Sequence, residues 1–392
     1  MEIKFLALSE LYVPQKGGHI IWFYEICNRL GKVKLLTRKE EGYPDKEMSG
    51  PLEVVRVFMR RVNWCVPQSL PIYFNLFFTG LKHSRGADVI LSARVIPEGC
   101  IGTLVGLIRR KPHVVIVHGE EINRLKYLTG RNAINQLVVF FKKKTIWLTL
   151  KHADMVIANS IFTRNLLVEG GIAPEKVKIV HPGTDPEQFQ PKEKNPRLIK
   201  KLGLEGKVVL LSIGRLTPRK GQDMTIRALP AILRACPDAV YVVVGGGDYG
   251  KTLQQIAREE DVLESVKFCD AVSDEDLSDF YNLCDVFLMP NRTLENSADV
   301  EGFGIVFLEA NACLKPVIGG LSGGVPDAVD HGKTGVLVDA NIPDNIADTV
   351  VTLLSDPDKM EAMGRTGRQR VIDNFTWNHS AEKIQQYVKQ LI

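Results

Sequence analysis

Short apolar segments alternate with longer amphipathic segments along the whole chain, and this alternation constrains the fold more than any other feature. The amphipathic segments, such as those at about residues 19–30 and 134–150, have a helical period. Strands that alternate with helices form parallel sheets covered on both faces, so we predict an α/β fold. The predicted strands form two series: Ile3–Leu8, Val33–Thr37, Val54–Phe58, Asp88–Leu91, His113–Val117, Met155–Ala158 and Val177–Val180, then Val208–Ile213, Ala239–Val244, Val266–Phe268, Asp285–Met289, Pro316–Ile318 and Val336–Val338.

Between the two series, from Pro186 to Lys207, Pro, Lys and Glu replace most apolar residues. We interpret this stretch as a linker between two Rossmann-like, doubly wound domains, residues 1–186 and 187–374. The last helix, within residues 375–392, has no strand after it, and we expect it to pack back on the first domain. Ligands of open α/β sheets bind beyond the carboxyl ends of the strands, so we expect these loops to line one interdomain cleft.

Charge is distributed unevenly between the two halves. Residues 1–190 contain 27 Lys and Arg against 17 Asp and Glu, a difference of +10, whereas residues 191–392 contain 23 against 29, a difference of −6. The basic half either faces an anionic partner, such as a membrane surface, or is a solvated lysine-rich surface. We expect no nucleic-acid partner.

The sequence also predicts a compartment. It has no apolar run long enough to span a bilayer, and its first residues lack the pattern of a signal peptide. The seven cysteines are scattered without C-x-x-C pairs, which is typical of reduced thiols. We therefore expect a cytoplasmic protein, peripheral on the inner face of the cell membrane if the basic half binds lipid.

A membrane-surface patch is one interpretation of the helix that carries Lys142-Lys143-Lys144. Such a patch would consist of these lysines, Trp147 beside them, Arg60-Arg61 and the aromatic segment 72–78. The alternative is that the apolar residues of this helix form a core-facing side.

The segment from Glu301 to Glu309, sequence EGFGIVFLE, combines two carboxylates with a Gly-Phe-Gly step. We interpret it as a loop that becomes a helix near Gly304, with Glu301 on the loop and Glu309 in the helix. Both acids could then point into one pocket near the helix N-terminus, whose free N–H groups bind anions. Such a pocket suits a ligand with a phosphate in one part and hydroxyl groups in another.

A basic loop, Gly214-Arg215-Leu216-Thr217-Pro218-Arg219-Lys220-Gly221, follows the first strand of the second series. Arg215 can grip a phosphate through two N–H groups, and Lys220 adds a compact charge. A departing diphosphate needs such a clamp where its charge develops. The alternative is a basic turn on a solvated surface.

The segment Gly245 to Thr252, sequence GGGDYGKT, matches the phosphate-binding P-loop pattern. Taken alone it would indicate a nucleoside triphosphatase. It follows the second strand of its domain, however, and no convincing strand ends in a partner aspartate. We therefore favour a glycine turn that lets a ligand approach, with Gly247 as a contact.

The remaining polar signals are weaker. His118 ends a predicted buried strand, where it is either a structural hydrogen bonder or a functional group. The acidic runs 274–276 and 356–358 precede helical patterns and indicate helix caps rather than metal ligands, and Ser160 is a further predicted cap. No His and Cys cluster has zinc spacing, so we expect no metal.

The sequence resembles those of the retaining glycosyltransferases of family four, which have the GT-B fold. The residues that together carry this resemblance are Gly17-Gly18, His118, Gly214-Arg215, Lys220-Gly221 and the Glu301/Glu309 pair. The sequence GIVFLEA at 304–310 and the turn HPGTD at 181–185 look most like those of the bacterial phosphatidylinositol mannosyltransferases. The resemblance covers nearly the whole chain. It departs at Glu120-Glu121 and in the segment Asn291–Val300, which leaves the substrate open.

The resemblance implies roles for individual residues. Arg215 and Lys220 would bind the donor's diphosphate, Glu309 the ribose, and Glu301 the donor sugar. His118 would contact the sugar from the first domain, and together these residues, apart from Glu309, would act in the transfer. The other implied donor contacts are Gly17, Gly18, Gly214, Gly247, Val272 in the base-binding segment, Gly302, Phe303, Gly304 and Ile305.

The function implied is a retaining, metal-independent hexosyltransferase that needs no cofactor. The donor would be GDP-mannose or a UDP-sugar carrying glucose or GlcNAc, and the acceptor a lipid-linked group or a glycan. Two alternatives stay open: a P-loop nucleoside triphosphatase that uses GGGDYGKT, and a sugar-nucleotide epimerase on the same fold.

Overall fold

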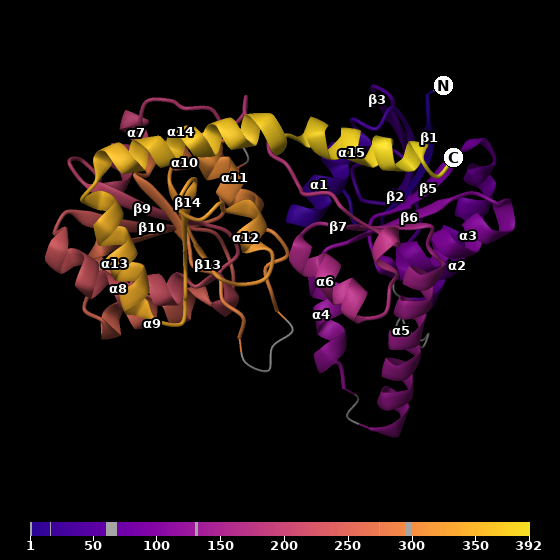
Figure 1. The fold of residues 1–392 in the computed structure, drawn as a ribbon, viewed down its shortest axis with the longest axis horizontal. Coiled ribbons are helices and arrows are strands. Elements are labelled where there is room, and N and C mark those ends of the chain that lie inside the picture. The colour runs from indigo at the N-terminus through magenta and orange to yellow at the C-terminus, as the bar shows by residue number, and fades with distance from the viewer. Residues whose placement is uncertain (1, 16, 60–68, 130–131, 274, 295–298) are drawn as a thin grey trace. The chain divides into compact units, whose positions relative to one another are not determined.

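The computed structural model describes residues 2–392 except 16, 60–68, 130–131, 274 and 295–298. The chain divides into two compact units (Figure 1). Unit 1 comprises Met1–Pro182 and Trp377–Ile392, and unit 2 comprises Gly183–Thr376. Each unit contains one sheet covered by helices, which confirms the predicted α/β class.

Unit 1 is built on an eight-stranded sheet of order β3-β4-β2-β1-β5-β6-β7-β8. The apolar segments predict all of these strands except β3. The strands are β1 (Lys4–Leu8), β2 (Lys32–Arg38), β3 (Lys46–Ser49), β4 (Leu52–Val57), β5 (Val89–Ser92), β6 (His113–Val117), β7 (Met155–Ala158) and β8 (Val177–Ile179).

Strand β3 corrects the expectation of a wholly parallel sheet, because it pairs antiparallel with β4. Its residues, Lys46 to Ser49, are mostly exposed at the sheet edge. An edge strand needs no apolar face and is often protected by charged side chains. The apolar pattern that predicts the other strands therefore could not predict this one.

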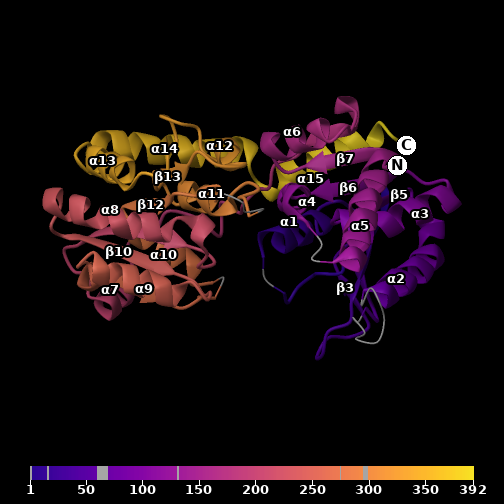
Figure 2. The same cartoon turned by 90° about the horizontal axis from the view of Figure 1, so that it is seen from below.

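The helices of unit 1 bury apolar side chains on the sheet. Leu6 and Leu8 of β1 pack with Ile72 of α2 and Ile101 of α3, and α2 and α3 lie side by side (Figure 2). The Ser160 side chain accepts a hydrogen bond from the Thr163 N–H, so it is the predicted cap of α6. The helices are α1 (Gly18–Cys27), α2 (Leu70–His83), α3 (Cys100–Arg109), α4 (Glu120–Tyr127), α5 (Ala133–His152), α6 (Ile161–Glu169) and α15 (Trp377–Lys389), with single turns η1 (Ser84–Gly86), η2 (Val95–Gly99) and η3 (Pro174–Lys176).

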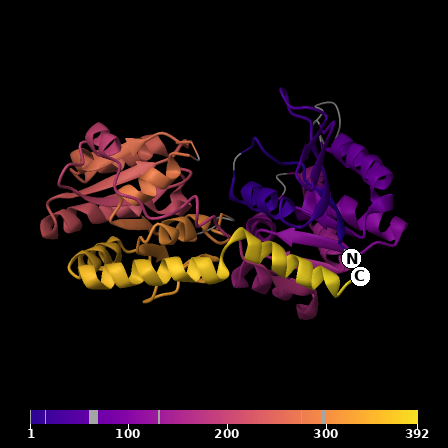
Figure 3. The same ribbon diagram turned by 90° about the horizontal axis from the view of Figure 1, so that it is seen from above.

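Helix α15 belongs to unit 1 although it ends the chain (Figure 3). It packs against α1, where the Arg29 Nε donates to the Asn378 side chain at 3.0 Å. The Ser380 hydroxyl donates to the His181 carbonyl at 2.7 Å. Trp377 and Ile384 are buried in this contact, so α15 supplies part of the unit 1 core.

Unit 2 has a wholly parallel sheet of order β11-β10-β9-β12-β13-β14. Helices α8, α9 and α13 cover one face, and α7, α10, α11 and α14 cover the other (Figure 1). The strands are β9 (Val208–Ile213), β10 (Ala239–Val244), β11 (Val266–Cys269), β12 (Val286–Met289), β13 (Val317–Gly320) and β14 (Gly335–Val338). The helices are α7 (Pro196–Leu202), α8 (Gln222–Ala235), α9 (Gly250–Glu259), α10 (Leu277–Leu283), α11 (Ile305–Ala312), α12 (Val325–Ala328), α13 (Pro343–Leu354) and α14 (Pro357–Asn374), with turns η4 (Pro218–Lys220) and η5 (Leu263–Ser265).

Helix α7 lies within residues 186–207, whose composition indicates a linker. Asn195 caps it by accepting from the N–H groups of Arg197 and Leu198, and Gly203 ends it in the left-handed conformation. An Asn-Pro start and a Gly end are ordinary helix signals. The polar composition obscured them, because α7 contributes only partly buried side chains to the core.

Among the described residues, no helix has both the length and the apolar character that crossing a bilayer requires.

Candidate active site

The centre of the candidate site in unit 2 is the carboxylate of Glu301. Its Oε2 accepts hydrogen bonds from Lys220 Nζ at 2.6 Å, from Arg219 Nη1 at 2.7 Å and from Asn291 Nδ2 at 3.1 Å. Lys220 and Arg219 lie in η4 after β9, and Asn291 follows β12. The carboxyl ends of the neighbouring strands β9 and β12 therefore place two cations and one amide beside the Glu301 carboxylate.

These charged groups are largely withdrawn from water. Burial alone would raise the pKa of Glu301, but the charges and hydrogen bonds of Lys220 and Arg219 outweigh it and lower the pKa to about 2. Burial lowers the pKa of Lys220, and Glu301 opposes that shift. Arg215, exposed at the same loop, adds positive potential on Lys220. Arg215, Arg219 and Lys220 outnumber the carboxylates of Glu301 and Asp299, which leaves a net positive site that suits a diphosphate.

Arg219 is a site residue that sequence reasoning missed. Its side chain is 6 % exposed and pairs with both Asp299, at 3.0 Å, and Glu301. A second buried pair joins Arg292 to Asp223 through hydrogen bonds of 2.9 and 2.6 Å. The Arg219 carbonyl also accepts from the Arg292 N–H at 2.9 Å. These contacts attach both ends of the segment 291–301 to η4 and to the start of α8.

The predicted loop-to-helix change at Gly304 is present. Gly304 caps α11 at φ 99°, which leaves Glu301 on the loop and Glu309 in the helix. The two acids have different partners, however. Glu309 accepts a hydrogen bond from the Tyr281 hydroxyl at 2.5 Å, and Glu301 accepts from the basic loop. Of their neighbours, Phe303 is buried in the core, and Gly302 and Ile305 are half-buried.

The glycines of GGGDYGKT have a packing role. A Cβ on Gly245 would lie 2.0 Å from the Gly214 carbonyl oxygen, and one on Gly247 would lie 2.5 Å from that of Leu216. The Leu216 N–H donates to the Gly246 carbonyl. This glycine loop therefore packs against the basic loop, and that contact explains Gly245 and Gly247 without a bound triphosphate. Lys251 is exposed.

His118 follows β6 in unit 1, as predicted, and is partly buried. Its Nε2 lies 2.9 Å from the Ala93 carbonyl oxygen, and its ring centroid lies 5.4 Å from those of His19 and Trp22. Burial, with the charge of His19, lowers the pKa of His118 to about 3. Because a carbonyl can only accept, Nε2 carries the proton, and Nδ1 is left as an acceptor. His19 lies in α1 next to Gly18, and Gly17 caps that helix.

The two glutamates after Gly119 have different environments. Glu120 pairs with Arg124 at 2.8 Å on the surface. Glu121 turns inward and accepts from the N–H groups of His118, at 3.3 Å, and Val95, at 3.4 Å. Burial raises the pKa of Glu121 to about 7, although the charge of Arg94 opposes the shift. Glu121 thus holds the His118 turn against the loop after β5.

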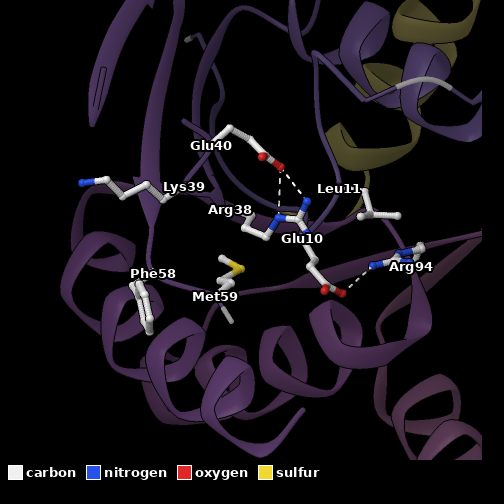
Figure 4. Close-up of a pocket in the computed structure, with 8 residues that line it drawn as sticks. All are labelled: Glu10, Leu11, Arg38, Lys39, Glu40, Phe58, Met59 and Arg94. Atoms are coloured by element: carbon white, nitrogen blue, oxygen red, sulfur yellow. Dashed lines mark hydrogen bonds and ion pairs between the residues drawn. The ribbon is translucent and has the colours of Figure 1, made fainter. Parts of the chain in front are cut away.

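A pocket of about 580 Å³ opens at the carboxyl ends of β1, β2, β4 and β5 (Figure 4). Sequence reasoning missed it, although charged residues at several strand ends were a signal. Glu40 pairs with Arg38 at 2.6 Å, and Glu10 pairs with Arg94 at 3.1 Å. The walls are therefore zwitterionic rather than simply basic. The lining residues are Glu10, Leu11, Arg38, Lys39, Glu40, Phe58, Met59 and Arg94.

Three other predictions concern residues that the structure describes. Val272 is half-buried after β11 and packs on the core. Asp356 caps α14, as predicted, by accepting from the Lys359 N–H. Asp276 occupies the cap position of α10 without a side-chain cap bond. In the part of the chain that the structure describes, no group of three or more His, Cys, Asp or Glu could hold a metal ion.

The predicted membrane patch is only partly assembled. Trp147 is partly buried and packs on the core of unit 1 beside α6, where a Cβ on Gly170 would lie 1.9 Å from its ring. In the aromatic segment, Ile72 and Leu76 are buried and Phe74 and Phe78 are exposed. Arg60-Arg61 lies outside the described residues.

Comparisons with known proteins agree with this geometry. The family description "Glycosyltransferase Family 4" matches residues 25–188, and "Glycosyl transferases group 1" matches residues 194–370. The chain is 36 % identical over 389 residues to a GDP-mannose-dependent alpha-(1-6)-phosphatidylinositol monomannoside mannosyltransferase of Mycolicibacterium smegmatis, covering 97 % of this chain and 96 % of that one. It is 31 % identical to a D-inositol 3-phosphate glycosyltransferase of Streptomyces bingchenggensis, covering 95 % and 85 %.

Solved structures show the same fold at low identity. The Anabaena protein Alr3699/HepE, in complex with UDP and glucose, aligns with a TM-score of 0.75 at 20 % identity, covering 99 % of both chains. Sucrose-phosphate synthase from Thermosynechococcus elongatus aligns with a TM-score of 0.76 at 22 % identity, again covering 99 % of both.

The fold and the relatives define a glycosyltransferase with the GT-B fold, which moves a sugar from a nucleotide sugar. Within that class the chain belongs to glycosyltransferase family four, and its sequence is similar to those of phosphatidylinositol monomannoside mannosyltransferases of Mycolicibacterium smegmatis and Mycobacterium tuberculosis.

Proposed function

We propose that the chain transfers mannose from GDP-mannose, with retention of the anomeric configuration, to an inositol-containing lipid acceptor. The observation that carries this proposal is the cluster of Arg219, Lys220 and Glu301 at the strand ends of unit 2. The mannosyltransferase and inositol glycosyltransferase names of the relatives support the choice of sugar and acceptor.

In this proposal the cations stabilise the leaving group. The bond between the sugar and the diphosphate breaks, and the bonding electrons stay with the phosphate oxygen. Lys220 and Arg215 stabilise that charge as it develops. The acceptor hydroxyl attacks the anomeric carbon through an oxocarbenium-like state, and its proton passes to the departing phosphate. Because side-chain cations supply the positive charge, the proposal needs no metal ion, and turnover should persist in excess chelator.

Glu301 has to exchange partners when the donor binds. Its carboxylate now accepts from both Lys220 and Arg219. A diphosphate would compete for Lys220, and sugar hydroxyl groups would donate to Glu301 in its place. Arg219 would keep Glu301 ionised and in position, since it also holds Asp299. Glu309, fixed by Tyr281, would accept from the ribose hydroxyls.

We propose that the zwitterionic pocket of unit 1 binds the acceptor. Glu10 and Glu40 can accept from polyol hydroxyls, and Arg38 and Lys39 can meet a phosphate group (Figure 4). We also propose that a lipid acceptor is met at an anionic membrane surface on the cytoplasmic side. The six described cysteines are all free, which agrees with a reducing compartment.

The test is transfer with labelled donor. The purified protein is incubated with GDP-mannose, UDP-glucose or UDP-GlcNAc and a phosphatidylinositol monomannoside, and the configuration of the product linkage is determined by NMR. We expect mannosyl transfer with an α linkage retained. Transfer only from a UDP-sugar, or an inverted product, would reject this assignment.

The two rival functions give different results in the same assay. An epimerase would convert the nucleotide sugar without acceptor. A nucleoside triphosphatase would release phosphate from ATP or GTP and would lose that activity on Lys251→Ala. We expect neither activity, and we expect Lys251→Ala to leave transfer nearly unchanged because Lys251 is exposed.

A further inference from the structure

The loop that carries Glu301 is supported by an aromatic side chain from the far end of unit 2. The Phe303 ring stacks on the Phe375 ring, with centroids 6.2 Å apart and planes at 28° to one another. Both side chains are buried in the same core. Phe303 lies two residues after Glu301, whereas Phe375 follows α14, so the end of unit 2 supports residues 301–304, which we call the Glu301 loop.

The Phe375 ring is held in turn by Arg370 of α14. The guanidinium carbon of Arg370 lies 4.3 Å from the centre of the ring, which is a cation–π contact. Arg370 also donates from Nη1 to the Ala328 carbonyl at 2.7 Å and from Nη2 to the Asp327 carbonyl at 2.8 Å. The last carbonyls of a helix lack partners within it, so Arg370 completes the end of α12 and is itself fixed against Phe375.

The start of α12 contacts the Glu301 loop directly. The N–H of Gly324, which precedes α12, donates to the Glu301 carbonyl at 2.9 Å. The backbone of Glu301 is therefore held by α12, and the side chain of Phe303 is held by Phe375. Because Arg370 contacts both α12 and Phe375, one side chain connects the two supports of the loop.

The backbone of Phe375 is fixed as well. Its carbonyl accepts a hydrogen bond from the Thr184 N–H at 2.8 Å, and Thr184 forms an isolated β-bridge with Thr376. Thr184 is the second residue of unit 2 and Thr376 is the last. The segments that enter and leave unit 2 thus hold Phe375 between them, so its ring is a rigid support.

We propose that Phe375 and Arg370 are positioning residues for the donor sugar, which hold the Glu301 loop where the Glu301 carboxylate meets the sugar hydroxyls. This inference rests on the proposed function, which gives Glu301 that role, and deepens it. When a diphosphate takes Lys220, Glu301 loses one side-chain partner, and the supports of its backbone then decide where the carboxylate lies. Small displacements matter because a hydrogen bond weakens steeply with distance and angle.

The first experiment measures hydrogen–deuterium exchange of the full chain without ligand. Phe375→Leu keeps a large apolar side chain but removes the ring that stacks on Phe303 and contacts Arg370. We expect faster exchange in peptides that cover residues 301–309. Phe280→Leu, at another buried phenylalanine of the same core, is the matched control and should leave that exchange unchanged. Unchanged exchange in Phe375→Leu would overturn the proposal.

The second experiment compares the affinities for GDP-mannose and GDP by titration calorimetry. Phe375→Leu should raise the Kd of GDP-mannose about tenfold, because it loses a ring stack and a cation–π contact. The Kd of GDP should stay unchanged, because GDP has no sugar for Glu301 to hold.

Arg370→Met should have the same effect as Phe375→Leu and guards against a single variant that fails to fold. Arg365→Met, at an exposed residue of the same helix that pairs with Glu361, should change neither affinity. Equal losses of affinity for GDP and GDP-mannose would overturn the proposal, since the two residues would then support the whole unit instead of the sugar site.

This inference and the proposed function fail separately. If the parent transfers sugar only from a UDP-sugar, the proposed donor is rejected, and the same comparison is made between that UDP-sugar and UDP. If the parent transfers no sugar at all, the proposed function is rejected, and the exchange experiment still decides whether Phe375 holds the Glu301 loop.

Discussion

Glu301 and Glu121 are both largely withdrawn from water, yet their surroundings shift their pKa values in opposite directions. Glu301 faces two cations, and its pKa falls from 4.5 to about 2. Glu121 accepts from two backbone N–H groups and has the single charge of Arg94 nearby, so burial raises its pKa from 4.5 to about 7. At residue scale, burial raises the pKa of both acids, and the number of partner charges decides whether the net shift is upward or downward.

This contrast predicts opposite effects of pH on stability. Glu301 contributes stability that is present above pH 4.5 and is lost as pH falls toward 2, about 3 kcal/mol in all. The charged form of Glu121 is unfavourable in the fold, so its contribution is lost as pH rises from 4.5 to 7, by a similar amount. Urea unfolding of Glu301→Gln and Glu121→Gln against the parent across pH 2.5–8 measures both. If the free energy of unfolding of each variant changed with pH as the parent's does, between pH 2.5 and 4.5 for Glu301 and between pH 4.5 and 7 for Glu121, the two pKa shifts would be contradicted.

A second prediction at this scale separates the two adjacent cations. Lys220→Ala should lower kcat about 10²–10³-fold, by analogy with the loss of one oxyanion donor. Arg219→Ala removes a buried partner of both Asp299 and Glu301, so it should also destabilise the fold, by about 3 kcal/mol. Steady-state kinetics and urea unfolding measure the two effects. Arg227→Ala, which breaks a more exposed ion pair with Glu260, is the control. Full turnover of Lys220→Ala would show that the clamp is assigned wrongly.

Elements with a buried apolar face could be predicted from the sequence, and those without one could not. Strands β6, β7, β9 and β10 begin and end at the predicted residues. The exposed strand β3 and the polar helix α7 were missed. At the site, the strand ends pointed to Lys220 and Glu301, which the structure pairs with one another, but nothing in the sequence singled out Arg219. Its role depends on Asp299, which is eighty residues away in sequence and is brought close only by the fold.

At the scale of elements, the contact between the glycine loop after β10 and the basic loop after β9 leads to a prediction about two neighbouring glycines. A side chain on Gly245 would meet the Gly214 carbonyl at 2.0 Å, whereas one on Gly246 would meet nothing within 4 Å. Gly245→Ala should therefore displace the basic loop, lowering both the melting temperature and the affinity for GDP-mannose. Gly246→Ala should change neither by much. Thermal melting with and without donor tests this pair. Equal effects of the two substitutions would mean that packing does not explain these glycines.

At the scale of the whole molecule, the chain ends in the unit where it began. Helix α14 belongs to unit 2, and α15 completes unit 1 against α1. The last sixteen residues therefore contribute to a core whose other residues come from the first 182. Unit 1 cannot be complete until the ribosome has made unit 2, and its stability depends on the end of the chain.

That dependence predicts the effect of shortening the chain. Ending it after Thr376 removes the buried side chains of Trp377, Ala381, Ile384 and Val388, and leaves their contacts on α1 open to water. Calorimetry should show an early transition for unit 1, whereas the melting of unit 2 should still shift upward with GDP-mannose. A chain ending after Lys389 is the matched control and should melt like the parent, because the residues removed lie beyond α15. A single unshifted transition in the shorter chain would mean that α15 does not stabilise unit 1, and loss of the nucleotide shift would mean that donor binding needs more than unit 2.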